Sequence, residues 1–439
     1  MPVSSNQQSD PFDLKALVPR ELAATTRWRI AFSGGPDSTS LLLAFARTFP
    51  LPQLAAVHVD HGVDPAAGRW AETCAASARQ LGVPLEIRQV AGLGTQASEA
   101  ELRAARYAAF CEVLEEGDTL VTAHHQADVA ETVLLAALRG GAPHELAAIP
   151  ALRKLGRGWL WRPWLAYPQS QLHGPLADSG LRMIDDPANH RERHRRSLLR
   201  QRVLPVLERG WPDAAALLAG TADRQARAAR VQDELLDELL AGPAGAPRPD
   251  ALPATLLTPR SSAVQVALAQ RFLRRAGVSL PPERQLRELL RQRCECRPDR
   301  HPQLSWDQQV LRCWRGNLYL LPRSALAPLE ETAGVTQTWL SRELPLPDGS
   351  RLRWVGPGEA PELVVHVGAP AGDAAGFPPP RRLRKLFQEQ GVPPWERRHT
   401  PVLLHQAQLA QVGLNWSSRR FTAIKRDRGL TIEWVRPGT

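Results

Sequence analysis

Apolar and polar positions alternate between strand-like and helix-like periods over the first ~210 residues. The strand-like segments are Arg29–Phe32, Leu54–Asp60, Pro84–Val90 and Thr119–Ala123. The helix-like segments between and after them are Leu41–Arg47, Arg69–Leu81, a helix opened by the Ser98/Glu101 capping box and running to Val113, and Asp128–Arg139. This alternation predicts an α/β fold with a parallel sheet and helices on both faces, in which ligands bind beyond the carboxyl ends of the strands.

The pattern becomes helical from about Ala214 and richer in strands toward the end of the chain. The expected helices are Asp223–Leu240, Ser262–Ala276 and Glu283–Arg293. The later strand signals are Val310–Trp314, Leu318–Leu321, the Asp348-Gly349 turn, Leu363–Val367 and Ile432–Val435. Gly242–Pro253 and Ser324–Gln337 have the composition of linkers. We expect three domains: an α/β domain over 1–213, a mainly helical one over 214–325 and a small α+β one over 338–439.

Composition narrows the class of protein. With 43% hydrophobic residues, the 439-residue chain can bury real cores. No apolar run approaches the ~20 residues of a membrane helix, and the N-terminus lacks a secretory signal. The five cysteines form no disulfide framework, and Cys294, Cys296 and Cys313 are too sparse for a metal site. These features predict a cytoplasmic protein without a membrane partner.

The charge balance favours a polyanionic partner. Lys and Arg number 55 against 45 Asp and Glu, which gives a net charge of +10 and a pI near 10.1. Such an excess favours nucleic acid, because phosphates neutralised by Lys and Arg release counterions. A GC-rich genome, which encodes arginine often, would produce the same excess and fits the abundance of Ala, Pro and Arg, so both explanations stay open.

The first predicted strand runs into Ser33-Gly34-Gly35-Pro36-Asp37-Ser38, which precedes a helix. Glycines let the backbone approach a phosphate, and a helix N-terminus presents free N–H groups and positive dipole. Pro36 suits the first helical position. No lysine precedes the final serine, which argues against a Walker loop. Asp37 next to phosphates requires a cation, and Mg²⁺ is the natural choice. A capped Gly-rich turn without a ligand is the alternative.

Two carboxylates begin the helix after the fourth predicted strand. Asp128 and Glu131 are three residues apart, so they share a helix face. An acidic helix start that stabilises its own dipole is the alternative to a functional role for this pair. Four histidines lie at two strand ends without a metal-ligand spacing, so we expect them to line a polar cleft rather than bind zinc: His58, His61, His124 and His125.

Arginines gather in two further segments. Arg196 and Arg200, in the run 189–202, are four residues apart and can reach one anion if they lie on a helix, with a solvated face as the alternative. Near the C-terminus, Trp395 lies among basic residues, which suits phosphate contact with base stacking. Trp395 suits the core of a small domain equally well. The basic residues of this second segment are Arg381, Arg382, Arg384, Lys385, Arg397, Arg398 and His399.

The hexad 33–38 is the signature of the ATP pyrophosphatases, and four other segments resemble those of the tRNA(Ile)-lysidine synthetase family. They are Val57–Gly62 (VHVDHG), the helix with Glu99, Arg103, Arg106 and Tyr107, Asp186–Asn189 followed by Arg196 and Arg200, and Arg381–Pro401. The resemblance covers nearly the whole chain after Phe12. The chain departs from the family pattern at Ala127, Val129 and Ser197, where the family has an acid, Gln and Asn.

The resemblance implies that ATP adenylates the C2 oxygen of the first anticodon cytidine of a CAU tRNA(Ile). The amine of free L-lysine then displaces AMP, which leaves lysidine. The implied catalytic residues are Asp37, which also holds Mg²⁺, Asp128 and Glu131. The implied ATP-binding residues are Ser33, Gly34, Gly35, Pro36, Asp37, Ser38, His58, Asp60 and His61. The lysine-binding candidates are His125, Asp128, Glu131 and Thr132. The candidates for contact with tRNA or phosphate are Arg103, Arg106, Arg196, Arg200, Arg381, Arg382, Arg384, Lys385 and Arg397.

Two other functions remain as alternatives. One is a different ATP pyrophosphatase that thiolates or amidates tRNA, although no cysteine cluster or glutaminase nucleophile is recognisable. The other is a basic tRNA-binding protein without catalysis, which the intact hexad disfavours. The sequence leaves open the oligomeric state, including a homodimer, the arginines that contact the anticodon, and the means of rejecting methionine tRNA.

Overall fold

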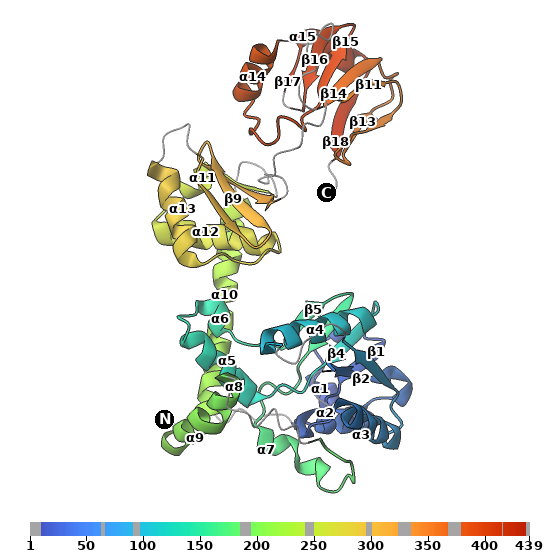
Figure 1. Cartoon of the computed structure of the whole chain (residues 1–439), viewed down its shortest axis with the longest axis vertical. Coiled ribbons are helices and arrows are strands. Elements are labelled where there is room, and N and C mark those ends of the chain that lie inside the picture. The colour runs from blue at the N-terminus through green and yellow to red at the C-terminus, as the bar shows by residue number, and fades with distance from the viewer. Residues whose placement is uncertain are drawn as a thin grey trace. The chain divides into compact units, whose positions relative to one another are not determined.

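The computed structural model describes residues 10–62, 66–90, 97–184, 195–241, 250–295, 301–323, 335–367, 379–414 and 416–435 (Figure 1). The chain divides into two compact units, Met1–Glu234 and Leu235–Thr439. The segment Asp186–Asn189, Cys296 and most of both expected linkers lie outside the described residues. The three expected domain boundaries stay a prediction.

A six-stranded sheet forms the centre of the first unit. Its order is β3 (Leu85–Gln89), β2 (Leu54–Asp60), β1 (Arg27–Ala31), β4 (Asp118–Val121), β6 (Gly158–Trp161) and β5 (Leu152–Leu155). The pairs from β3 to β6 are parallel, which confirms the predicted α/β class. The β5–β6 hairpin was not predicted, and it adds an antiparallel strand at one edge. Order β2-β1-β4 places the carboxyl ends of β1 and β4 side by side.

Helices cover both faces of this sheet (Figure 1). Ala56 and Val57 are consecutive on β2, so their side chains point to opposite faces. Ala56 packs into the core with α2 (Pro36–Thr48) and α3 (Ala67–Gln80), whereas Val57 packs with α4 (Glu99–Val113). The predicted capping box at Ser98 and Glu101 is present at the start of α4.

The remaining helices of this unit follow the sheet or connect its strands. They are α1 (Leu14–Leu17), α5 (Gln126–Ala137), α6 (Pro143–Leu146), α7 (Gln169–Leu172), α8 (Arg195–Leu198), a π-helical turn (Leu199–Val203), α9 (Leu204–Gly210) and α10 (Ala214–Ala241), with short 3₁₀ turns at Arg20–Leu22, Leu51–Gln53 and Gly174–Leu176. Helix α5 begins just after β4, at the carboxyl end of the sheet. Helix α8, the π-helical turn and α9 form one uninterrupted helical run.

A buried ion pair fixes the register of three strands. Arg29 on β1 is 5% exposed, and its Nε lies 2.5 Å from Asp118 Oδ2 on β4. Its Nη1 lies 3.1 Å from Glu86 Oε2 on β3. A buried charge left without its partner is strongly unfavourable, so a shift of either partner strand would be opposed by this contact.

The second unit begins with a layer of helices on a four-stranded antiparallel sheet. The sheet order is β7 (Ala251–Leu252), β10 (Asn317–Pro322), β9 (Gln309–Trp314) and β8 (Gln303–Trp306), and the helices are α11 (Ala254–Leu257), α12 (Ser262–Arg275) and α13 (Glu283–Glu295). The predicted hairpin turn at Arg315-Gly316 is confirmed, and both residues have positive φ. This part therefore holds a sheet as well as the expected helices.

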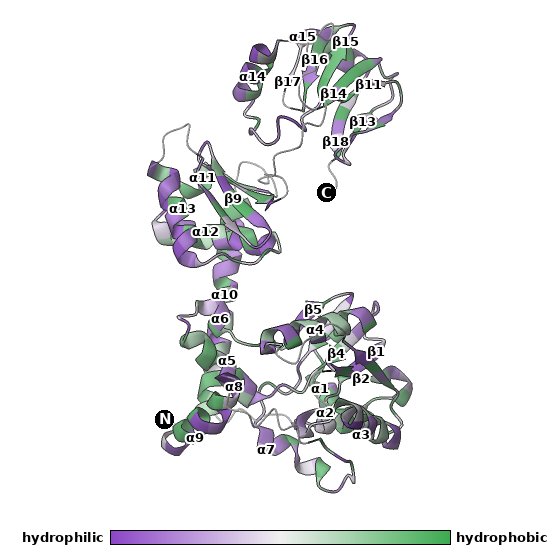
Figure 2. Cartoon of the chain, viewed as in Figure 1, coloured by the Kyte–Doolittle hydropathy of each residue, from purple (hydrophilic) through white to green (hydrophobic). Residues whose placement is uncertain are grey.

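The C-terminal part contains two antiparallel sheets. One has the order β11 (Val335–Trp339), β14 (Leu363–Val367), β15 (Val402–His405), β16 (Gln408–Val412) and β17 (Trp416–Ser417), and the other has β12 (Glu343–Pro345), β13 (Arg351–Val355) and β18 (Thr431–Val435). The helices are α14 (Pro380–Glu389) and α15 (Arg419–Asp427). The core packs Trp339 on Trp354, with ring centroids 5.0 Å apart, and β14 and β15 are largely hydrophobic (Figure 2). Within the described ranges, no helix is long and apolar enough to cross a membrane.

Candidate active site

The hexad 33–38 joins β1 to the start of α2, as predicted. Gly35 is the N-cap of α2 and Pro36 occupies its first turn. The hydroxyl groups of Ser33 and Ser38 lie 3.0 Å apart, and Ser38 Oγ donates to the Gly35 carbonyl at 3.1 Å. The serines therefore hold the loop in shape, while the first N–H groups of the helix have no partner within the helix, as in other anion-binding helix starts.

Gly34 occupies a position that no other residue fits. Its φ is +83°, in the left-handed region. A Cβ there would lie 2.3 Å from Ile184 Cδ1 and 2.8 Å from Cys74 Sγ. The Gly34 carbonyl also accepts the Ile184 amide at 2.8 Å. Glycine is therefore required at position 34 by the packing of the loop against the segments that carry Cys74 and Ile184.

Asp37 projects from the first turn of α2 into a set of nitrogen donors. Gln169 Nε2 and His173 Nε2 donate to Asp37 Oδ1 at 2.9 and 2.7 Å. His125 Nε2 lies 3.7 Å from Oδ2. Burial alone would raise the pKa of Asp37, but His125, Gln169 and His173 outweigh it and hold that pKa well below its usual range. Asp37 is therefore ionised, and Oδ2 keeps capacity for a cation.

His125 connects the loop to the start of α5. It is 2% exposed, and its Nε2 lies 3.7 Å from an oxygen of Asp37 and 3.7 Å from an oxygen of Asp128. Burial lowers the pKa of His125, but the carboxylates of Asp37 and Asp128 raise it further, so the net shift is upward. Asp128 Oδ2 also caps the helix by accepting the His125 amide at 2.9 Å. The two carboxylates beside Nε2 therefore favour the imidazolium form of His125.

The two carboxylates of α5 share one arginine. Glu131 is 0% exposed, and Arg200 Nε donates to its Oε1 at 2.6 Å. Arg200 Nη2 donates to Asp128 Oδ1 at 3.0 Å. Burial raises the pKa of Glu131 and Arg200 partly offsets this, while nearby Asp128 adds to the rise. The predicted pair therefore faces a guanidinium group that comes from the π-helical turn near α8.

Arg196 reaches the same helix face. Its Nη2 lies 3.5 Å from Thr132 Oγ1, and its Nε lies 3.9 Å from Glu99 Oε1. Thr132 Oγ1 donates to the backbone carbonyl of Asp128 at 2.8 Å. Arg196 and Arg200 thus lie beside α5, next to the residues predicted to bind lysine.

Arg103 and Arg106 of α4 lie in different surroundings. The Tyr107 hydroxyl accepts Arg103 Nη2 at 3.4 Å and Arg162 Nη2 at 3.3 Å. Burial raises the pKa of Tyr107, but these arginines lower it more. Arg106 Nε donates to His61 Nε2 at 3.4 Å, and burial together with Arg106 lowers the pKa of His61.

The other predicted histidines line the end of the sheet. His58 is buried, and its Nδ1 donates to the Phe32 carbonyl at 2.9 Å, just before the hexad. Asp60 Oδ1 accepts the Gly62 amide at 2.8 Å. His124 Nδ1 lies 2.8 Å from Thr122 Oγ1, and burial lowers the pKa of His124 to about 4. In the described part of the chain, no group of three His, Cys, Asp or Glu side chains is arranged to hold a metal ion.

The basic residues predicted near the C-terminus belong to the second unit. Four of them are exposed on α14: Arg381, Arg382, Arg384 and Lys385. Arg397 Nε donates to the Val392 carbonyl at 3.1 Å. Trp395 packs edge-on against Tyr319, with ring centroids 5.3 Å apart, and against Trp314 at 6.3 Å. Its ring is therefore partly buried in an aromatic cluster of this unit, which favours the core interpretation of the two left open.

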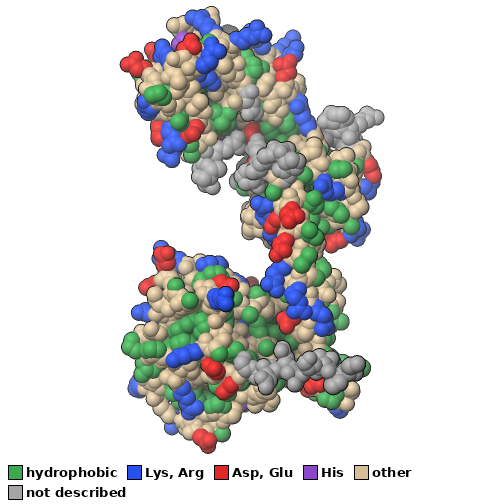
Figure 3. All heavy atoms as spheres, turned by 180° about the vertical axis from the view of Figure 1, so that it is seen from behind, with side chains coloured by type: hydrophobic (Ala, Val, Ile, Leu, Met, Phe, Trp, Pro, Cys, Tyr) green, Lys and Arg blue, Asp and Glu red, His purple; other side chains and the backbone are tan. Residues whose placement is uncertain are grey.

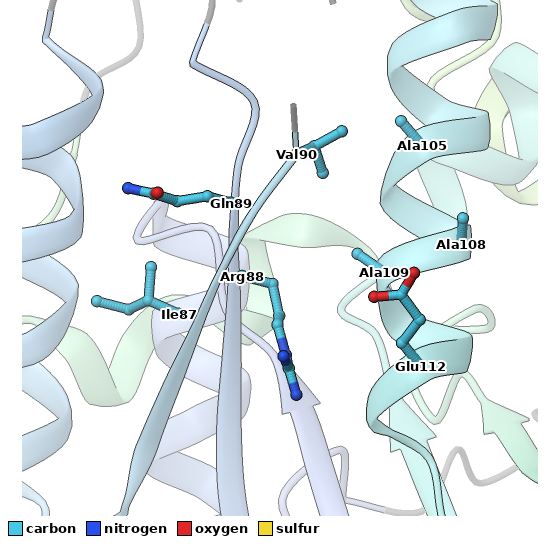
Figure 4. A pocket seen from close by; sticks show the side chains of 8 residues that line it. All are labelled: Ile87, Arg88, Gln89, Val90, Ala105, Ala108, Ala109 and Glu112. Atoms are coloured by element: carbon cyan, nitrogen blue, oxygen red, sulfur yellow. The ribbon is translucent and has the colours of Figure 1, made fainter. Parts of the chain in front are cut away.

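A separate hollow lies between the edge strand β3 and α4. Arg88 and Val90 extend from the strand toward Ala105, Ala109 and Glu112 on the helix (Figure 4). Its volume is about 710 Å³, and none of the predicted site residues lines it. Figure 3 shows Lys and Arg side chains at many places on the surface of both units, interspersed with hydrophobic and acidic ones.

Sequence reasoning missed several partners of the predicted residues. Gln169 and His173, which bond Asp37, lie more than 130 positions along the chain from it. Arg162 is 3% exposed and bonds Tyr107, but its segment carries no motif. No periodicity or spacing signals such contacts. His173 could have been identified only from its position near the other polar side chains, and that position is a result of tertiary structure.

Family models match three stretches of the chain. A model described as the PP-loop domain matches residues 9–207, the TilS substrate binding domain matches 252–319, and the TilS substrate C-terminal domain matches 373–434. The tRNA(Ile)-lysidine synthase of Alkalilimnicola ehrlichii is 37% identical over 423 residues, which cover 92% of each chain. That of Methylococcus capsulatus is 35% identical over 427 residues, covering 93% of this chain and 96% of its own.

Gly34→Ala should destabilise the first unit. The left-handed backbone costs about 1–2 kcal/mol for a non-glycine residue, and forcing a methyl group against Ile184 and Cys74 costs about 1–3 kcal/mol more. Urea unfolding measures the change. Gly35→Ala is the matched control, because its φ is −71° and the nearest atom to its Cβ is Ser33 Oγ at 3.6 Å. Equal losses for both variants would contradict the packing argument.

Asp37→Asn should lower the pKa of His125. Burial lowers this pKa, and the variant lacks one of the two carboxylates that raise it. NMR titration of the histidine rings measures this, with His125→Gln to assign the signal. In the wild type, the pairing of His125 stabilises the fold below the unfolded-state pKa, and this stabilisation is lost as pH rises through the raised folded-state pKa. Asp60→Asn serves as the control and should leave the His125 signal unchanged; a shift as large as that of Asp37→Asn would refute the assignment.

Proposed function

The chain belongs to the tRNA(Ile)-lysidine synthase family, and we propose that its active site joins the hexad 33–38 to the acidic start of α5. Family membership confirms the resemblance predicted from the motifs, the ATP-using ligase class and the formation of lysidine on tRNA(Ile). The residue roles, the use of Mg²⁺ and the binding of free L-lysine are proposals. They rest on one observation above all, the chain of contacts from Asp37 through His125 to Asp128, Arg200 and Glu131.

The hexad is proposed to bind the phosphates of ATP. The left-handed Gly34 brings the backbone close, and the first N–H groups of α2 supply donors and positive dipole. Asp37 fits a divalent cation because it is ionised and, among the described residues, its Oδ2 has no ion-pair partner closer than 3.7 Å. When bound there, Mg²⁺ would offset the charge of Asp37 and of the departing pyrophosphate. Gln169 and His173 hold the other carboxylate oxygen in place.

His125 is proposed to position the carboxylates for both half-reactions. It lies between Asp37 in the nucleotide part and Asp128 in the proposed amine part, so it fixes their separation. Its raised pKa favours the charged form, which keeps the two acids from repelling each other. The protein groups proposed for adenylation of the cytidine C2 oxygen therefore lie next to those proposed for attack by the lysine amine.

Asp128 and Glu131 are proposed to receive the lysine ε-amine. The pair already holds a cation, the guanidinium of Arg200, so its charge and spacing suit one. Glu131 is fully buried and its pKa is raised, so it accepts a proton more readily than an ordinary glutamate. An ammonium group bound here would lose a proton to Glu131 and become nucleophilic. Arg196 and Arg200 are then placed to contact the phosphates of the nucleotide or tRNA.

The basic residues of α14 and Arg397 are proposed as tRNA contacts outside the catalytic centre. All four α14 residues are exposed, and helices that present arginines suit contact with the phosphate backbone. A cytoplasmic location follows from tRNA as the proposed substrate. A homodimer likewise stays a proposal.

The purified protein, given ATP, Mg²⁺, labelled lysine and a CAU tRNA(Ile), should release AMP and pyrophosphate and incorporate lysine into the tRNA. The same tRNA with another wobble base, and reactions without lysine or ATP, serve as controls. Incorporation of sulfur or ammonia in place of lysine would instead favour the thiolating or amidating alternatives.

Asp37→Asn and Glu131→Gln should separate the two half-reactions. Asp37→Asn should abolish both AMP release and lysine transfer while changing tRNA affinity little, because the metal and phosphate site is lost. Glu131→Gln should keep tRNA-dependent ATP–pyrophosphate exchange but lower lysine transfer by roughly 10²–10⁴-fold, the range of a lost general base. Glu72→Gln, an exposed acid on α3, is the control. Equal loss of exchange in both variants would contradict these roles.

A further inference from the structure

Three arginines from separate segments of the first unit gather around one tyrosine, and the proposed mechanism gives them no role. Tyr107 lies on α4, and its hydroxyl oxygen accepts Arg103 Nη2 at 3.4 Å and Arg162 Nη2 at 3.3 Å. The guanidinium carbons of Arg103 and Arg153 lie 5.0 and 5.2 Å from the centroid of the Tyr107 ring. We define the arginine–tyrosine cluster as Arg103, Tyr107, Arg153 and Arg162.

The cluster is built on a packed part of the fold. Arg153 belongs to β5, Arg162 directly follows β6, and Tyr107 packs against a hydrophobic cluster shared by α4, β5 and β6. Arg162 is 3% exposed, and its Nη1 donates to the Pro150 carbonyl at 2.6 Å. This bond and the surrounding packing fix the direction of Arg162. Arg103 and Arg153 are only half-buried, so a ligand can reach them from solvent.

The cluster carries three positive charges without a matching acid. Among the described residues, no Asp or Glu oxygen lies within 4.0 Å of a side-chain nitrogen of Arg103, Arg153 or Arg162. Glu99, at the start of α4, lies 3.9 Å from Arg196 instead. A buried guanidinium group without a counter-charge is costly, and like charges close together repel one another. An anion bound among these arginines would offset both effects.

The Tyr107 hydroxyl has a donor available for such an anion. A tyrosine hydroxyl has one O–H donor and accepts hydrogen bonds through its oxygen, and here two arginines supply the accepted bonds. Its own proton has no acceptor among the described residues. Burial raises the pKa of Tyr107, but the arginines lower it more, which makes the hydroxyl a stronger donor. Guanidinium groups beside a hydroxyl donor suit the oxygens of a phosphate group.

His124 connects the cluster to the acid pair. It lies next to His125, after β4, and burial lowers its pKa to about 4, so it is neutral. The charges that act on His124 include Asp128 of the acid pair as well as Arg162 and Arg103 of the cluster. In the sheet order, β4 lies between β1, which leads into the hexad, and β6, which leads into Arg162. The cluster therefore adjoins the acid pair on the side away from the proposed ATP phosphates, which favours a phosphate of the RNA.

We propose that the arginine–tyrosine cluster binds one backbone phosphate of the RNA substrate, at a nucleotide next to the cytidine that occupies the acid pair. Arg103 and Arg153 contact the phosphate oxygens, and Tyr107 donates its hydroxyl proton to the same phosphate. Arg162 is a positioning residue that holds the Tyr107 hydroxyl from its buried side. This inference rests on the proposed function in taking tRNA as the substrate, and it adds a site that fixes the RNA backbone beside the chemistry.

The test combines one change in the full-length protein with one change in the RNA. The probe is a CAU tRNA(Ile) in which a single linkage of the anticodon loop is a neutral methylphosphonate, moved one position at a time. For the wild type, one linkage beside the target cytidine should weaken binding roughly ten-fold, the loss of a charge-assisted contact. The double variant Arg103→Gln/Arg153→Gln should bind unmodified tRNA roughly ten-fold more weakly and respond to that linkage by less than about three-fold, because the contact is already lost.

Arg157→Gln is the matched control, since Arg157 is an exposed arginine of the same β5–β6 hairpin. It should bind both RNAs as the wild type does. Circular dichroism of each variant checks that it is folded.

Tyr107→Phe gives a second readout that does not depend on removing charge. It keeps the ring that packs on α4 and removes only the hydroxyl, so it should weaken tRNA binding roughly three- to ten-fold and reduce the cost of the same linkage. This variant carries the test if the double variant does not fold. The affinity for ATP, measured by calorimetry without RNA, should stay within about two-fold of wild type in every variant. The slope of log tRNA affinity against log salt should fall by roughly 0.7 in the double variant.

Three results would overturn the proposal. One is a wild type for which no single linkage beside the cytidine matters, and another is the same linkage cost in the wild type and in the variants, which would make the cluster a matter of packing. A third is a loss of ATP affinity with unchanged tRNA affinity, which would make the cluster a site for nucleotide phosphates. A linkage cost that depends on the cluster in a protein that transfers no lysine would support the cluster and reject the proposed function alone.

Discussion

One constraint organises the active site: several charges of both signs must lie close together in a partly buried place without leaving any unpaired. Asp37, His125, Asp128, Arg200 and Glu131 alternate in sign along a continuous set of contacts. Removing one member would leave its neighbours as uncompensated buried charges, which is costly. This alternation keeps Asp37 ionised beside the phosphate loop and keeps a carboxylate with raised pKa beside the proposed amine site.

The sheet order makes this arrangement possible. The hexad follows β1 and the acidic helix follows β4, and these strands are neighbours although about 90 residues separate them. The buried Arg29–Asp118 pair holds the same two strands in register. Two motifs that are proposed to serve different steps therefore meet at one edge of the sheet. The helical run that includes α8 contacts the second motif through Arg200, which bonds Glu131.

Arg200 belongs to the helical run formed by α8, the π-helical turn and α9, so the cation that pairs the two acids of α5 comes from a different segment of the chain. The exposed arginines of α14 provide a separate basic surface in the second unit.

The sequence by itself determined the α/β class, the strands and helices of the first 140 residues, the phosphate loop and the acid pair, because periodicity and motif spacing are local. The glycines of the hexad and the helix that follows allow its turn, whereas its packing against Cys74 and Ile184 comes from tertiary structure. Tertiary structure alone decided that Arg200 bonds the acid pair, that Gln169 and His173 hold Asp37, and that Trp395 is packed while Trp211 is exposed. These facts join residues tens to more than a hundred positions apart, and the local pattern around each is equally compatible with a solvated surface. Their energies come from burial and pairing, which exist only once the chain has folded.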